Sequence, residues 1–252
     1  MPINFIGIAT SSPSLKAERA LFALAWPLRA SLYMIAFFLT FCLTLSFSTP
    51  ASAQMLPSFN PLVMPAKDMN YLVIIAQEPL LALLEDREVR MPREDGLPRS
   101  LSLVRPMAVT LRLNGQILAR AFEIRSPAPL SVAALALGAK VMTAPDVGRP
   151  PELEELPNVK VAVAVLDNLT EAASDADIGP DQAVVVLNGF TIAVGLPSDL
   201  PPQAGSFALL SNACELFGLR KTIWLSDKSS LMYAPVTERM GQELGRTAKQ
   251  RR

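Results

Sequence analysis

The chain has 252 residues, half of them hydrophobic, which is enough apolar side chain for the packed core of one or two domains. Its 23 basic and 23 acidic residues cancel, so it lacks the basic field with which nucleic-acid-binding proteins attract phosphates. It contains no histidine, which excludes a Ser-His or Cys-His nucleophile and a histidine-bound zinc.

The N-terminal segment has the order of a secretory signal. A basic region precedes the uncharged run Ala30–Phe47, and a proline then breaks the run. Ala51 and Ala53 follow as the small side chains that signal peptidase requires. We therefore predict a signal peptide over residues 1–53, with cleavage after Ala53.

An uncleaved membrane anchor is the alternative, because the 18 residues of the apolar run are long enough to span a bilayer. Under both interpretations we expect the rest of the chain to be exported, to the periplasm or the extracellular space. We expect contact with the membrane only if the N-terminal segment remains uncleaved. Of the two cysteines, Cys42 lies in this segment, so Cys214 is left alone. An isolated thiol in an oxidising compartment is best buried.

After the signal, the pattern predicts a spacer over residues 54–65, one domain over 66–236 and a flexible tail over 237–252. The tail is polar and ends in basic residues. Helices are expected over Met69–Glu85, Leu130–Met142 and Ser206–Phe217.

Four local signals shape these helices. Asp68 is expected to cap the first helix, and Pro79 to kink it or divide it in two. Ser206 is expected to cap the third, which ends at Gly218. Cys214 falls on the apolar stripe of that third helix, so we interpret it as a core residue.

Two Asn-Gly pairs predict β-hairpins. The first covers Met107–Phe122 with its turn at Asn114-Gly115, and the second covers Ala183–Val194 with its turn at Asn188-Gly189. Alternating valines predict a further strand over Val159–Val165. Short strands are expected over Ile223–Leu225 and Leu231–Val236.

Arg120 is the one charge on the apolar face of the first hairpin. A two-residue turn pairs it with Val109. A buried guanidinium must reach water, a carboxylate or a bound anion. We favour an arginine whose stem packs while its head extends to water at the edge of the sheet. A one-residue change of register would move Arg120 to the other face.

The order of elements is helix, hairpin, helix, strand, hairpin, helix. Two hairpins with separate helices predict an α+β fold, in which helices pack on an antiparallel sheet.

Several fragments in this order resemble the AMMECR domain family, of which one member is protein A of the bacterial AmmeMemoRadiSam set. The resemblance runs from Tyr71 to Tyr233. Its fragments are Val109-Thr110-Leu111 with Asn114-Gly115, Glu155-Leu156 through Val163-Ala164-Val165-Leu166, Ile178-Gly179 with Gly189, Gly195-Leu196-Pro197, and Cys214 with Gly218-Leu219 and Trp224. It implies a two-part domain with an antiparallel sheet.

Three departures from the family affect polar positions proposed as its site. Leu118–Ala121 stands where the family has Arg-Gly-Cys, Asp146–Arg149 stands in place of Asp-Pro-Arg-Phe, and Ser198 replaces the Gln after Leu-Pro. The charged residues that remain, Arg120, Asp146 and Arg149, are the candidates for binding. We expect that Arg120 and Arg149 do not meet in one cleft.

Other carboxylates are weaker candidates. Glu152, Glu154 and Glu155 follow two prolines and are typical of a solvated loop. Asp175, Asp177 and Asp181 have a loose calcium-like spacing, but the glycine and final glutamate of a calcium loop are missing. We predict no catalytic residue, metal or cofactor.

We therefore expect a non-catalytic binding or assembly module of the cell envelope, with an envelope protein as partner. The alternative is an enzyme or an enzyme-accessory protein with a residual small-molecule pocket. The family association implies a radical-SAM partner, but such oxygen-sensitive clusters work inside the cell, so export argues against it.

Overall fold

The structure, a computed structural model, describes residues 64–90 and 96–251, and its fold is α+β. The strands are β1 (Met107–Leu113), β2 (Gln116–Glu123), β3 (Val147–Gly148), β4 (Val159–Leu166), β5 (Thr170–Ala172), β6 (Gln182–Asn188), β7 (Thr191–Gly195) and β8 (Ser229–Glu243). The α-helices are α2 (Ala66–Leu84), α3 (Leu130–Thr143), α4 (Ser206–Leu216) and α5 (Leu244–Gln250). The 3-10 turns are η2 (Arg99–Ser102), η3 (Leu156–Asn158), η4 (Asp175–Asp177), η5 (Pro197–Asp199) and η6 (Ile223–Leu225).

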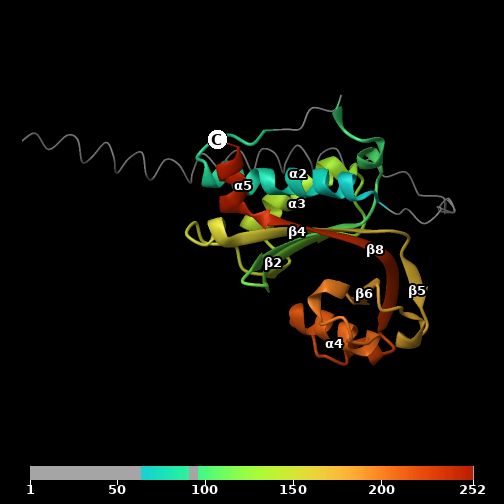
Figure 1. Cartoon of the computed structure of the whole chain (residues 1–252). Helices are drawn as coiled ribbons and strands as arrows, with labels where there is room; N and C mark the ends of the chain where they lie inside the picture. The colour runs from blue at the N-terminus through green and yellow to red at the C-terminus, as the bar shows by residue number, and fades with distance from the viewer. Residues whose placement is uncertain (1–63, 91–95, 252) are drawn as a thin grey trace, which may run out of the picture. The chain divides into compact units, whose positions relative to one another are not determined.

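The eight strands form an antiparallel, curled sheet in the order β3-β2-β1-β4-β8-β6-β7, and β5 pairs with β8 outside this path. β8 holds the sheet together, since its second half pairs with β4 and its first half pairs with β6 and β5. Figure 1 shows β8 bending from the strands under α2 toward those beside α4. The predicted α+β class, the two hairpins and the packed helices are confirmed.

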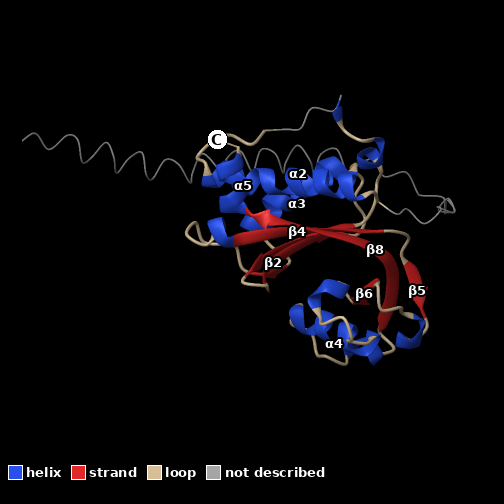
Figure 2. Cartoon of the chain, in the orientation of Figure 1, coloured by secondary structure: helices blue, strands red, loops and turns tan. Residues whose placement is uncertain are grey.

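Helices α2, α3 and α5 cover one face of β1, β2 and β4, as Figure 2 shows. The core between these layers consists of aliphatic side chains from every element involved. Pro79 lies inside α2, yet α2 is one helix of 19 residues, so the predicted division into two helices is wrong. The N-cap position is Pro65, and Asp68 instead accepts a hydrogen bond from Ser100 Oγ.

Helix α4 packs on β6 and β7 over a second core. Its C-terminus is a Schellman motif: Gly218 N donates to Glu215 O at 3.0 Å and Leu219 N donates to Cys214 O at 2.8 Å. Gly218 has a φ of +69°, as that motif requires. The N-cap position is Gly205, so the predicted Ser206 cap is wrong.

The first hairpin has the predicted turn and a different register. Leu113 pairs with Gln116, but Leu111 pairs with Ala119 and Thr110 with Arg120. One extra residue in β2, Leu118, makes a β-bulge that reverses the faces of every later residue in the strand. Arg120 consequently lies on the face opposite to the helices, which corrects the predicted pairing with Val109.

Three further predictions need correction. In the second hairpin Asn188 pairs with Thr191, so the turn is Gly189-Phe190, one residue later than expected. Ile223–Leu225 is a 3-10 turn and not a strand. The flexible tail over 237–252 is wrong, because β8 continues to Glu243 and α5 follows with Leu244 and Ala248 buried in the core.

The signal peptide, its cleavage residues Ala51 and Ala53, Cys42 and most of the spacer lie outside the described residues. In residues 64–90 and 96–251, none of the helices combines the length and apolar character needed to cross a bilayer.

Candidate functional site

Arg120 is the largest fully buried side chain in the described residues. Its Nη1 donates to Asp199 Oδ2 at 2.8 Å and its Nη2 donates to Asp199 Oδ1 at 2.6 Å. Its Nε donates to Thr110 Oγ1 at 2.8 Å, and Nη1 also donates to Val194 O at 3.1 Å. The prediction that the Arg120 guanidinium extends to water is therefore wrong, and the carboxylate alternative applies.

A second arginine binds the same carboxylate. Arg112 Nη2 donates to Asp199 Oδ1 at 2.9 Å and to Ser198 Oγ at 3.1 Å. Ser198 Oγ in turn donates to Glu238 Oε2, and Leu196 N donates to Asp199 Oδ2 at 2.9 Å. Two guanidiniums and two carboxylates thus balance in charge, and the Asp199 side chain is completely buried.

This network joins distant strands of the curled sheet, β2 next to one edge and β7 at the other. Arg120 belongs to β2, whereas Val194 belongs to β7 at the opposite edge, and Asp199 belongs to the η5 turn that follows β7. Removing a guanidinium from water costs several kcal/mol unless a carboxylate and further acceptors replace its hydration. Here every terminal nitrogen of Arg120 has such an acceptor, so the group holds β2 to β7 and its turn and presents no charge to a substrate.

Asp146 and Arg149 flank β3, the two-residue strand beside β2. Gly148 separates them with a φ of +78°, and a Cβ there would lie 2.1 Å from Leu118 O, so only glycine lets β3 approach β2 this closely. The Asp146 carboxylate binds Lys140 Nζ at 2.7 Å and accepts a hydrogen bond from Phe122 N.

Arg149 is half exposed and pairs with Glu155 through Nη2–Oε1 at 2.5 Å. The hydrogen bond from this guanidinium lowers the pKa of Glu155 to about 2. The three candidate residues therefore lie in or beside β2 and β3, but their side chains bind different partners and do not converge.

The structure brings together Arg120 and Ser198, two positions singled out by the family resemblance. It adds Arg112, Asp199 and Glu238, which sequence reasoning missed. A signal existed for Asp199, since it lies next to the Leu-Pro-Ser fragment. Nothing local could indicate Glu238, because it lies in the part of β8 that was expected to be a tail.

Cys214 is fully buried in α4. Burial raises the pKa of its thiol, although a hydrogen bond from the backbone of Trp224 opposes this. A thiol with a raised pKa carries little of the nucleophilic thiolate at neutral pH, so Cys214 is placed as a structural residue.

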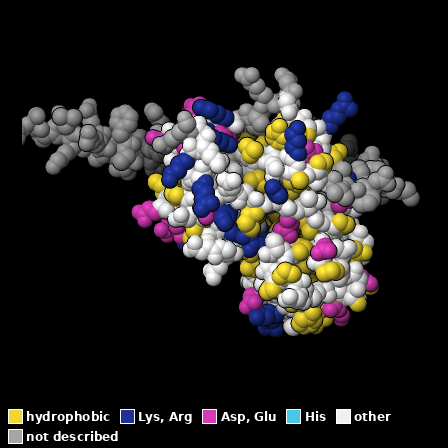
Figure 3. Space-filling view, viewed as in Figure 1, with side chains coloured by type: hydrophobic (Ala, Val, Ile, Leu, Met, Phe, Trp, Pro, Cys, Tyr) yellow, Lys and Arg dark blue, Asp and Glu magenta, His cyan; other side chains and the backbone are white. Residues whose placement is uncertain are grey.

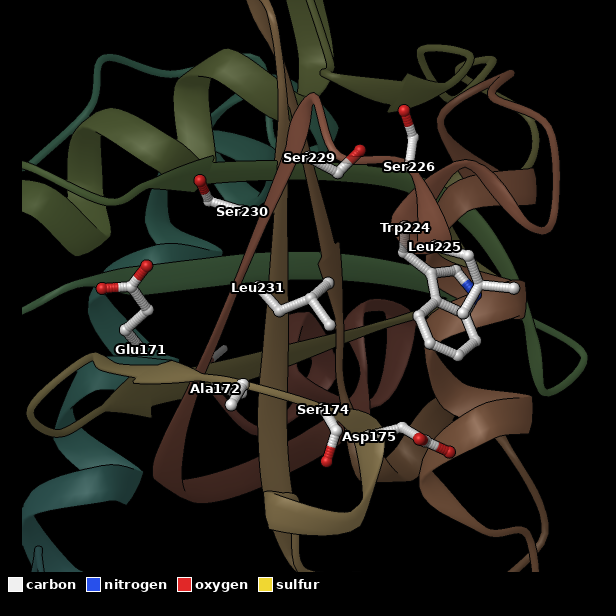
Figure 4. Close-up of a pocket in the computed structure, with 11 residues that line it drawn as sticks. Glu171, Ala172, Ser174, Asp175, Trp224, Leu225, Ser226, Ser229, Ser230 and Leu231 are labelled. Atoms are coloured by element: carbon white, nitrogen blue, oxygen red, sulfur yellow. The ribbon is translucent and has the colours of Figure 1, made fainter.

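One surface hollow in the described part of the chain is a groove of about 310 Å³, drawn in Figure 4. Its walls come from β5, the chain after it, η6 and the start of β8. It is lined by Glu171, Ala172, Ala173, Ser174, Asp175, Trp224, Leu225, Ser226, Ser229, Ser230 and Leu231. Two carboxylates and no basic side chain belong to this lining, so the groove is polar and acidic.

Exposed apolar side chains lie close to the groove. Leu225 on its rim is 61% exposed, and Phe207, 52% exposed, makes an edge contact with Trp224. The turn that carries fully exposed Phe190 is tied to this region, since Asn188 Nδ2 donates to Ser229 Oγ at 2.8 Å. Figure 3 shows hydrophobic atoms interspersed with acidic ones, and a basic group at the lower left, over the surface that α4 and β6 occupy in Figure 1.

Another hollow, of about 290 Å³, lies where α5 meets the end of α2. It is lined by Glu85, Arg87, Arg90 and Arg251. Two of these arginines, Arg87 and Arg251, bind the carboxylate of Glu78. The arginines are thus largely committed to ion pairs within the protein.

Metal-binding side chains do not gather in groups of three or more within the described residues. Asp177, from the calcium-like spacing, accepts the backbone N–H groups of Ala173 and Ser174 at 2.9 Å each. Its carboxylate therefore shapes the turn into η4.

The fold and this network define an α+β protein with a curled antiparallel sheet closed by buried ion pairs. The chain is similar in structure to the uncharacterized protein PH0010 from Pyrococcus horikoshii, with a TM-score of 0.55 and 19% identity over 71% of this chain and 94% of that one. At this identity the likeness concerns the fold alone. No protein-family model matches the chain, and no curated protein matches it either.

Proposed function

We propose that this chain is an exported, AMMECR-like binding or assembly module of the cell envelope, without a catalytic residue of its own. The observation that carries the proposal is the complete internal pairing of Arg120. Its guanidinium is 0% exposed and bound to Asp199, Thr110 and Val194. A group held in this way supports the sheet and cannot bind a substrate without losing those bonds.

The surface supports the same proposal. An enzyme site is expected to gather charged groups in a cleft, whereas a docking site combines apolar side chains with a polar rim. The region of Leu225, Phe207 and the Phe190 turn has this second character. Export is supported by the N-terminal pattern that ends in Ala51-Ser52-Ala53.

The alternative, an enzyme or accessory protein with a residual pocket, is favoured by one observation. The groove of about 310 Å³ is at the lower end of the size range of small-molecule sites. Its lining holds serines and carboxylates, but no histidine or basic residue that would complete an acid–base pair.

The test begins with cells that express the full-length chain. Fractionation and N-terminal peptide mapping should find the chain outside the cytosol, beginning at Gln54. Photo-reactive residues at Leu225, Phe190, Val132 and Leu153, all exposed, then report contacts on different faces. We expect protein adducts concentrated on one face. A cytosolic chain with intact Met1, or a retained small molecule in native mass spectrometry without any protein adduct, would contradict the proposal.

A further inference from the structure

We draw no further inference here: the strongest candidate, the apolar surface patch of Phe190, Phe207 and Leu225 beside the groove of Figure 4, carries none, because nothing in the residues that the structure describes shows what covers it.

Discussion

The Arg120 guanidinium and the Asp199 carboxylate face each other with two hydrogen bonds, of 2.6 and 2.8 Å, in the interior of the sheet. The two residues are 79 positions apart in the chain. Their pairing connects β2 with the turn after β7, on the face of the sheet where Ala108, Val194 and Leu196 belong to a further apolar core.

Removing this carboxylate should be costly. Asp199→Ala leaves Arg120 and Arg112 without their shared partner, and we expect a loss of about 3–5 kcal/mol in the free energy of unfolding. Urea denaturation followed by circular dichroism measures it. The control is Glu155→Gln at the solvent-screened Arg149 pair, which should cost far less than Asp199→Ala. Equal losses in the two variants would show that the buried pair contributes little.

The close crossing of α2 and α3 gives a second prediction. A Cβ on Gly138 would lie 2.2 Å from Ala76 O, so Gly138→Ala must push the helices apart. We expect a loss of about 1–3 kcal/mol, although alanine favours helix elsewhere. Gly205→Ala, at a position with open space around it, serves as the control. Thermal denaturation of both variants measures the loss. Unchanged stability of Gly138→Ala would contradict the close contact between α2 and α3 at this position.

Glu78 should make stability depend on acid pH. Burial by itself raises the pKa of Glu78, but hydrogen bonds from Arg87, Arg251 and Arg90 N together outweigh it and hold the pKa below its usual value. A carboxylate with a lowered folded pKa contributes stability above its unfolded pKa, near 4.5, and loses it as the pH falls through the folded value.

The variant Glu78→Gln tests this. At neutral pH it should lower the free energy of unfolding by about 1–3 kcal/mol, because three donors lose a charged acceptor. The difference in unfolding free energy between Glu78→Gln and the parent chain should shrink as the pH falls below the usual pKa of a glutamate, 4.5. A difference independent of pH would indicate that packing, and not the charge of Glu78, is responsible.

The Cys214 thiol should resist alkylation in the folded chain. It is 0% exposed and burial raises its pKa, so iodoacetamide at neutral pH should label it only after denaturation. Mass spectrometry of the peptide that contains Cys214 separates it from Cys42. Rapid labelling under native conditions would show that α4 opens readily or that the thiol is activated.

Local features of the sequence predicted the local structure well. Asn114-Gly115 specifies a tight turn because both residues tolerate positive φ, and both have it, at 52° and 84°. Gly218 ends α4 for the same reason. Alternating and helical periods also indicated the strands, the helices and the α+β class, since these patterns reflect one buried face per element.

The site depended on contacts between distant segments. The bulge at Leu118 places Arg120 on the face with Thr110, and no local pattern distinguishes that register from the regular one. The length of β8 was missed because its second half is polar and is held by pairing with β4 and not by its own propensity.

The sequence by itself thus determined the Asn114-Gly115 turn, helices α2, α3 and α4 and the strands of the two hairpins, because backbone sterics and the periodicity of apolar residues act between near neighbours. Only the tertiary structure decided the partner of Arg120, since burying a guanidinium is favourable only where folding brings a carboxylate from 79 residues away into the same dry space.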